Sequence, residues 1–226
     1  MPAAAAVSPR SARLLRIPAT LPSRQGVLLT FDDGPHPRGT PAVLAALGRE
    51  GVPAVFFVCG EQAIRYPEIL REIVFAGHEL AVHGFRHQSR RQWTGTLVVD
   101  DTRRALDAVW DAASVVPRLY RPAHGIFSSS GLRAIRRLGL EPLLWSRWGR
   151  DWQRGATGAS IARRVTASLR AGDVLLLHDA DHYGTHESWK STVAALGEIV
   201  SRIRAAGLEA TSLRATPGIG TLELAV

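Results

Sequence analysis

The sequence predicts a single α/β domain built on a parallel sheet, either open or closed into a barrel. Short apolar runs bounded by glycine or charge alternate with amphipathic stretches from residue 26 onward. The length of 226 residues suits one domain of the larger kind. The single cysteine excludes an internal disulfide framework, and no apolar run approaches the roughly 20 residues of a membrane span.

Six apolar runs predict buried strands, and six amphipathic stretches predict helices. The strands are expected at 27–31, 54–58, 80–82, 119–120, 142–145 and 174–177. The helices are expected at 40–49, 66–76, 98–112, 131–138, 160–170 and 190–206. Pro41 and Ser160 are residue types that begin helices, and glycines punctuate the ends of several stretches. This alternation predicts one domain over 26–226.

Residues 1–25 carry no periodic pattern, and we expect them to be poorly ordered or draped over the domain. They lack the apolar stretch of a secretory signal, so the chain as written is predicted to be cytoplasmic. A different start would allow the cell envelope or secretion. The net charge is +8, but the arginines are scattered and no nucleic-acid motif is present, so no nucleic-acid partner is expected.

Polar or titratable residues follow five of the predicted strands. In chain order they are Asp32 with Asp33, His83, Arg121, Ser146 and His178. Active sites of parallel α/β folds are assembled at the carboxyl ends of the strands, where the loops converge. The sequence therefore predicts an active site at this end of the sheet.

The histidines at 83 and 87 are four residues apart, a spacing that lets one helical turn aim two imidazoles at one metal. The spacing recurs elsewhere in the chain, so by itself it also fits a structural or surface role. Adjacent Asp32 and Asp33 cannot point the same way in an extended chain. One can bind a metal while its neighbour turns toward a substrate, although either also fits a turn or helix cap.

Five motifs, taken in order, resemble those of the polysaccharide deacetylase family, the NodB-homology group also called carbohydrate esterase family 4. They are TFDDGP at 30–35, the His83/His87 pair, RPAHG at 121–125, Asp151-Trp152 and LLH at 176–178. The resemblance covers roughly 26–213. It implies a distorted (β/α) barrel of seven or eight strands.

The resemblance also implies a divalent metal, most often zinc, held by Asp33, His83 and His87. Two imidazoles and one carboxylate leave positions open for water and for the substrate's carbonyl oxygen. Cobalt or ferrous iron can occupy the same set of ligands. Such a metal lowers the pKa of water and polarises an acetamide.

The resemblance assigns two proton-transfer roles and two supporting roles to four further residues. Asp32 is implied to be the general base, and His178 the general acid that protonates the departing amine. Arg121 is implied to pair with the base, and Asp151 to orient the acid.

The resemblance also implies substrate-binding positions. Trp152 and Leu176 resemble the apolar wall that receives the acetyl methyl group, although each fits plain core equally well. The backbone N–H of His124 corresponds to the family's oxyanion donor, whatever its side chain. Trp93, Trp145 and Trp148 are candidate stacking platforms, with Trp145 expected in the core. Cys59 is expected to be a buried, inert thiol.

The chain departs from the family pattern around the pocket mouth. Gly84 stands where serine or threonine is usual, Ala123-His124 replace proline and an aromatic, and Trp148 stands where aspartate is frequent. The polar segment 179–189 is a candidate loop for sugar recognition, although His182 and His186 in it fit a second metal. These departures leave the sugar undetermined.

The sequence thus predicts a metal-dependent hydrolase that removes N-acetyl groups from amino sugars of a glycan or glycoconjugate. Its expected partner is an N-acetylated oligo- or polysaccharide, and a monomer is expected. One alternative is hydrolysis of O-acetyl esters or small non-sugar amides at the same metal site, since a fold does not fix a substrate. A second is a non-catalytic glycan-binding barrel, which would normally have lost a ligand or the base.

Overall fold

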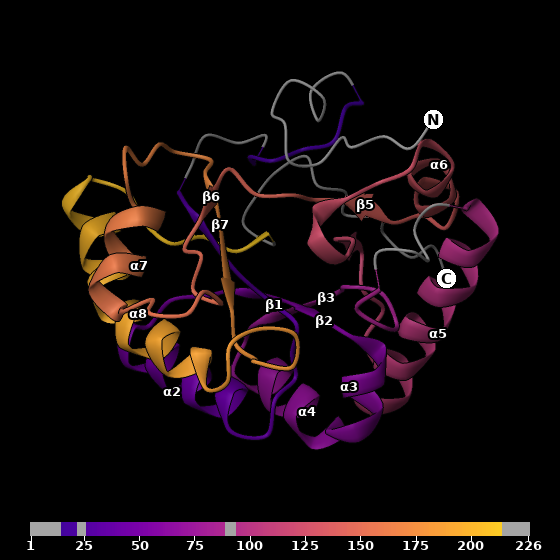
Figure 1. Cartoon of the computed structure of the whole chain (residues 1–226), viewed down its shortest axis with the longest axis horizontal. Coiled ribbons are helices and arrows are strands. Elements are labelled where there is room, and N and C mark those ends of the chain that lie inside the picture. Colours follow the sequence, from indigo (N-terminus) through magenta and orange to yellow (C-terminus); the bar gives the residue numbers. More distant parts are fainter. Residues whose placement is uncertain (1–14, 22–25, 89–93, 214–226) are drawn as a thin grey trace.

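The computed structural model describes residues 15–21, 26–88 and 94–213. Seven parallel strands form one curled sheet in the order β5-β4-β3-β2-β1-β7-β6, and the helices form an arc around its outer side (Figure 1). The strands are β1 (Leu28–Asp32), β2 (Val55–Val58), β3 (Glu79–Val82), β4 (Leu119–Tyr120), β5 (Glu141–Pro142), β6 (Arg147–Trp148) and β7 (Val174–His178). The predicted single-domain α/β barrel is confirmed in the form of a half-barrel.

Seven α-helices lie within the described residues. They are α2 (Gly39–Glu50), α3 (Gly60–Arg65), α4 (Pro67–Phe75), α5 (Gly95–Ala113), α6 (Ser129–Arg137), α7 (Gly158–Val165) and α8 (Ser188–Ala205). The prediction missed α3, because its six residues are too few for a periodic pattern. Helix α7 begins two residues earlier than expected, since Thr157 caps it and Ser160 completes a capping box. None of these helices is both long and apolar enough to cross a membrane.

The predicted strand 142–145 is wrong. The structure has two separate two-residue strands instead: β5 ends at Pro142, and β6 begins at Arg147. The carbonyl groups of Leu143 and Leu144 accept hydrogen bonds from the Arg121 side chain, at 3.0 and 2.9 Å. Because a buried guanidinium takes these carbonyls, the backbone between β5 and β6 does not form a regular ladder.

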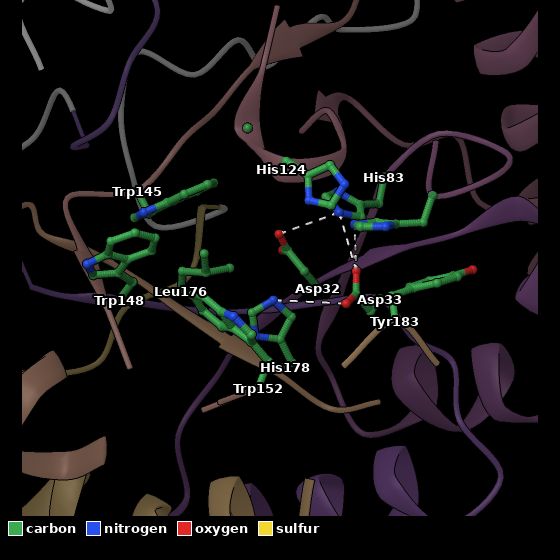
Figure 2. A pocket seen from close by; sticks show the side chains of 12 residues that line it. Asp32, Asp33, His83, His124, Trp145, Trp148, Trp152, Leu176, His178 and Tyr183 are labelled. Atoms are coloured by element: carbon green, nitrogen blue, oxygen red, sulfur yellow. Dashed lines mark ion pairs between the residues drawn. The ribbon is translucent and has the colours of Figure 1, made fainter. Parts of the chain in front are cut away.

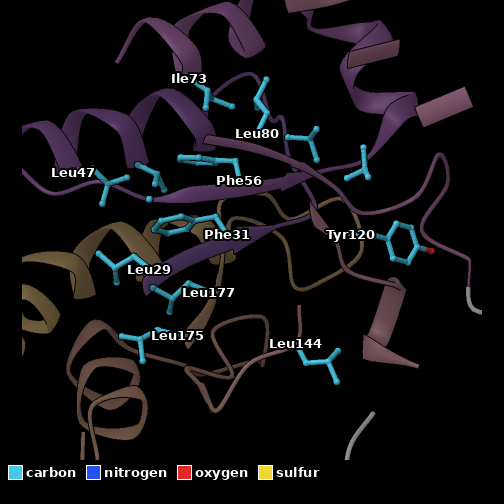
Figure 3. Packing of buried hydrophobic residues seen from close by; sticks show 14 of the residues in the cluster. Leu29, Phe31, Leu47, Phe56, Ile73, Leu80, Tyr120, Leu144, Leu175 and Leu177 are labelled. Carbon is cyan, nitrogen blue, oxygen red and sulfur yellow. The ribbon is translucent and has the colours of Figure 1, made fainter. Parts of the chain in front are cut away.

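The apolar core lies on both faces of the sheet. Strands buried on both faces read as continuous apolar runs, and their alternate residues enter different clusters. On the helix side, Phe31 stacks on Phe56 with ring centroids 5.1 Å apart (Figure 3). On the inner side, Leu28 and Phe57 belong to a second cluster. Each such buried side chain contributes about 1.5–3 kcal/mol, so the core holds the strand ends in register.

Part of the N-terminal segment packs on the domain. Ile17 and Leu21 are buried, and Thr20 forms an antiparallel bridge with Asp173. The remainder of the predicted 1–25 segment, residues 1–14 and 22–25, lies outside the described residues, as does Trp93.

Candidate active site

The pocket begins at the carboxyl end of β1 (Figure 2). Asp32 is the last residue of this strand, and Asp33 follows it with a φ of 79°. This left-handed conformation is tolerated by aspartate and turns the chain sharply. As a result the two carboxylates diverge: Asp32 meets Arg121, and Asp33 faces His83 and His87.

Asp33, His83 and His87 form one cluster whose potential ligand atoms lie within 4.8 Å of one another. Asp33 Oδ1 is 3.4 Å from His83 Nε2 and 3.5 Å from His87 Nε2. This oxygen is buried and has no hydrogen-bond partner in the described structure. His83 Nδ1 donates to the Arg121 carbonyl at 2.8 Å, which leaves its Nε2 lone pair free. The three side chains therefore fit a single divalent cation.

Burial sets the charge of this cluster. It lowers the pKa of His83 well below its usual range, and it lowers the pKa of His87 to about 2, with His83 adding to the effect. Neutral imidazole is the form that binds a metal. Burial also raises the pKa of Asp33 to about 7. A carboxylate desolvated in this way gains from a cation beside it.

Arg121 fixes the Asp32 carboxylate through a hydrogen-bonded ion pair. The guanidinium is fully buried, and its Nη1 donates to Asp32 Oδ1 at 2.6 Å and to Thr30 Oγ1 at 2.9 Å. It also lies over the Phe57 ring, 3.9 Å from the centroid. Burial raises the pKa of Asp32, and Arg121 opposes that rise. A fixed carboxylate with a raised pKa suits the role of a proton acceptor.

His178 ends β7 and is held by Asp151. Its backbone N–H donates to Asp151 Oδ2 at 2.6 Å, and its Nδ1 donates to Oδ1 at 2.9 Å. Thr192 Oγ1 also donates to Asp151, at 2.8 Å. Burial alone lowers the pKa of His178, but Asp151, Asp33 and Asp32 outweigh it and raise the pKa to about 10. The ring Nε2 lies 4.0 Å from Asp33 Oδ2, so this nitrogen faces the pocket.

Comparison with known proteins agrees with this geometry. A family model described as polysaccharide deacetylase matches residues 21–143. The chain belongs to the polysaccharide deacetylase family. A chitooligosaccharide deacetylase from Sinorhizobium fredii is 36% identical over 88% of this chain and 95% of the relative.

Two solved structures are similar over most of the chain. A family 4 carbohydrate esterase from Streptomyces lividans in complex with acetate has a TM-score of 0.75 and 28% identity, covering 85% of this chain and 95% of that one. A family 4 acetyl xylan esterase from Clostridium thermocellum in complex with cobalt has a TM-score of 0.74 and 25% identity. The match covers 83% of this chain and 88% of that one.

The pocket of this family member has an apolar wall on the His178 side. Leu176 and Trp152 line it, and Trp152 packs edge-on against the His178 ring with centroids 5.1 Å apart. Trp148 and Trp145 continue the wall, with ring centroids 6.2 Å apart. The expectation that Trp145 is core is wrong in part, because the half-buried ring also faces the pocket.

The predictions for Ser146 and His124 need correction. Ser146 does not join the site: its Oγ donates to Asp173 Oδ1 at 2.7 Å, near the amino end of β7. It precedes β6, whose position the prediction placed too early. His124 adds more than a backbone N–H, since its ring lies edge-on to the His87 ring at 4.5 Å. Cys59 is buried, as expected.

Gly84 is explained by a carboxylate from α5. The residue has a φ of 87°, and a Cβ there would lie 2.8 Å from Asp101 Oδ2. The same oxygen accepts a hydrogen bond from the Phe85 backbone N–H at 2.7 Å. Asp101 therefore fixes the start of the His83–His87 segment, in which Gly84 stands where serine or threonine is usual in the family.

The second metal suggested by the 179–189 loop is disfavoured by hydrogen bonding. His36, Asp181 and His182 do form a cluster of possible ligands. However, His36 Nδ1 accepts from the Gly39 N–H at 2.8 Å, so in the neutral ring the proton is on Nε2. That nitrogen lies 3.1 Å from Asp181 Oδ1, which is a hydrogen-bond arrangement. The His186 side chain is 83% exposed.

Sequence reasoning missed Tyr183 as an individual pocket residue. It lines the pocket opposite the tryptophans (Figure 2). The polar composition of 179–189 identified the loop, but no pattern distinguishes the tyrosine from its neighbours. Gly125 also lines the pocket and was not predicted.

Proposed function

We propose that this chain is a metal-dependent hydrolase that removes N-acetyl groups from amino sugars of a glycan or glycoconjugate. One observation carries the proposal: the Asp33, His83 and His87 cluster is flanked by a buried Asp32 on one side and by His178, hydrogen-bonded to Asp151, on the other. Zinc is the metal we expect, with cobalt or ferrous iron as alternatives. When bound, the ion polarises the acetamide carbonyl and lowers the pKa of water.

Asp32 is the proposed general base. It takes a proton from the attacking water as the new C–O bond forms at the acetamide carbon. Arg121 keeps the carboxylate in one orientation through the 2.6 Å hydrogen bond. The backbone N–H of His124, at the pocket lining, is the proposed donor to the developing oxyanion.

His178 is the proposed general acid. Its Nε2 proton passes to the sugar nitrogen as the C–N bond breaks, which gives acetate and a free amine. Asp151 holds the ring in the tautomer that presents Nε2 to the pocket, because the Nδ1 proton is bonded to the carboxylate at 2.9 Å.

The substrate class we propose is an oligomer of N-acetylglucosamine. The 36% identical relative is a chitooligosaccharide deacetylase, which supports this choice. Trp152, Trp148 and Leu176 provide an apolar wall beside His178, suited to the acetyl methyl group and the face of a sugar ring. The cytoplasmic location and the monomeric state stay predictions.

Acetate release from N-acetylglucosamine oligomers of increasing length tests the proposal. The protein is first stripped of metal, and zinc, cobalt or ferrous iron is then added back. We expect release only with added metal, rising with oligomer length if neighbouring sugars are bound. No release with any metal, in protein that binds one equivalent of zinc, would overturn the substrate class.

Hydrolysis of O-acetyl esters is the second candidate function. The similar acetyl xylan esterase from Clostridium thermocellum favours it. The leaving group of an ester is an alcohol. Its departure depends less on prior protonation than the departure of the amine from an amide. Acetylated xylan assayed beside the chitin oligomers separates the two: the second candidate predicts faster release from the ester.

A further inference from the structure

The two histidines of the metal cluster are supported in different ways. The His83 ring is bonded through Nδ1 to the Arg121 carbonyl at 2.8 Å, so its orientation is fixed by a hydrogen bond. His87 has no such bond to its Nδ1 within the part of the chain that the structure describes. A metal ligand of this kind normally has an outer partner that orients its ring. Another contact must therefore orient His87.

Ring packing supplies that contact. The Tyr183 ring lies parallel to the His87 ring, with centroids 4.4 Å apart and planes 13° apart. The His124 ring packs against His87 edge-on, with centroids 4.5 Å apart and an interplanar angle of 75°. A stacked face and an edge together restrict rotation of the imidazole about its bonds.

Tyr183 is itself anchored at its far end. Its hydroxyl donates to Glu61 Oε1 at 2.6 Å and accepts from Gln62 Nε2 at 3.3 Å. Both residues belong to the first turn of α3, and Gln62 is buried. The ring is thus fixed at its hydroxyl by α3 and at its face by His87.

The loop that carries Tyr183 is tied down on both sides of the pocket. His182 Nε2 donates to the Pro35 carbonyl at 3.1 Å, and Asp181 Oδ1 lies 3.1 Å from His36 Nε2. On the other side, the Thr185 N–H donates to the Trp152 carbonyl at 3.3 Å. These contacts connect the loop to the turn after Asp33 and to the wall beside His178.

The residues between His83 and His87 do not orient the His87 ring. Asp101 fixes its first half through the Phe85 N–H, at 2.7 Å. Gly84 has no side chain that could reach His87, and the Arg86 side chain is 45% exposed and directed toward Glu61. Tyr183 is the aromatic ring that stacks face to face on His87 among the described residues.

We propose that Tyr183 is a positioning residue for His87: its anchored ring holds the imidazole in the orientation needed to share one metal with Asp33 and His83. The inference rests on the ligand set of the proposed function. It couples the segment 179–189, whose Tyr183 also lines the pocket, to metal affinity.

Zinc affinity of the metal-free protein tests this inference without any substrate. Chelator competition is run on the natural chain, Tyr183→Ala and Tyr183→Phe. Loss of an outer-shell partner typically weakens metal binding about 10–100-fold, so we expect at least a tenfold loss for Tyr183→Ala. Tyr183→Phe keeps the stacked ring and loses only the anchor, so we expect a smaller loss.

His186→Ala is the matched control, because it changes the same loop at a side chain that is 83% exposed. Its zinc affinity should equal that of the natural chain. The visible absorption of bound cobalt gives a second readout, since it reports ligand geometry: Tyr183→Ala should alter it, and His186→Ala should not.

The outcomes separate the two proposals. Zinc binding by Tyr183→Ala as tight as in the natural chain, with an unchanged cobalt spectrum, would overturn the positioning role. A raised KM with unchanged zinc affinity would make Tyr183 a substrate contact instead. Failure of the natural chain itself to bind zinc would overturn the ligand set and the proposed function with it.

Discussion

His178 and His87 face the same pocket, but different kinds of contact hold them. His178 ends strand β7, and one carboxylate, Asp151, accepts hydrogen bonds from both its backbone N–H and its ring Nδ1. His87 lies five residues beyond the end of β3, and the rings of Tyr183 and His124 pack around it. The His178 ring is therefore held by hydrogen bonds to a carboxylate, and the His87 ring by packing against other rings.

The difference extends to their neighbours. The proton-transfer side consists of Asp32, Arg121, Asp151 and His178, and each of its charges has an opposite charge within 2.9 Å. The metal side consists of Asp33, His83 and His87, and the buried Asp33 Oδ1 has no hydrogen-bond partner in the described structure.

This contrast follows from the chemistry. A group that transfers protons is stabilised by permanent partners, which fix its tautomer and charge. A metal ligand has to keep one lone pair free, so fewer of its atoms are available for support. The predictions below disturb one side at a time.

The largest effect is expected from breaking the metal side with His83→Ala. Removal of a direct ligand should weaken zinc binding by more than the roughly 100-fold seen for outer partners, and metal-dependent acetate release should vanish. Metal content after dialysis measures this. His78→Ala is the control, since it also removes a buried imidazole but lies outside the pocket. An unchanged zinc load in His83→Ala would refute the ligand set.

Asp32→Asn should break the proton-transfer side alone. Loss of a general base typically costs about 10²–10⁴ in kcat, while zinc content should stay at one equivalent. Asp173→Asn is a matched control, because Asp173 is also buried and paired with an arginine, Arg147, at 3.1 Å. Near-normal turnover by Asp32→Asn would show that another group is the base.

Asp151→Asn tests how the Asp151 carboxylate sets the pKa of His178. Burial lowers the pKa of His178, and the charge of Asp151 is the first of the effects that raise it to about 10. Removing that charge should lower the pKa, which NMR titration of the metal-free protein can measure. Because the fold raises this pKa, the ionised His178 stabilises the protein below its unfolded pKa of about 6.5, and this is lost as the pH rises through about 10.

In Asp151→Asn the loss of stability with rising pH should therefore be smaller and should be complete at a lower pH. Thermal unfolding between neutral and alkaline pH follows it. A His178 pKa that does not move in the variant would contradict the account.

The smallest effect is expected at the apolar wall. Trp148→Ala should raise KM about 2–10-fold with little change in kcat, because an aromatic contact contributes about 0.5–1.5 kcal/mol. Trp110→Ala, on the outer side at α5 and 53% exposed, is the control. Equal KM values for the two variants would remove Trp148 from the binding surface.

Sequence reasoning went furthest where local pattern and position coincide. The buried strands β1 and β7 were predicted to within one residue at each end, because short apolar runs next to glycine or charge are distinctive. Their ends then placed Asp32, Asp33 and His178 at one edge of a sheet. Helix α3 was missed because six residues are too few for a helical pattern. Strands β5 and β6 were misplaced because the buried Arg121 side chain takes the backbone carbonyls between them, a contact between distant segments.

By itself, the sequence determined the α/β class, the strand ends that carry the titratable groups and, through five ordered motifs, the family. The tertiary structure decided what surrounds those groups. Tyr183 and His87 are 96 positions apart, and only the folding of the loop after β7 onto α3 brings their rings to 4.4 Å. Local patterns arise from residues close in the chain, whereas such contacts depend on packing between distant segments, which no short-range pattern encodes.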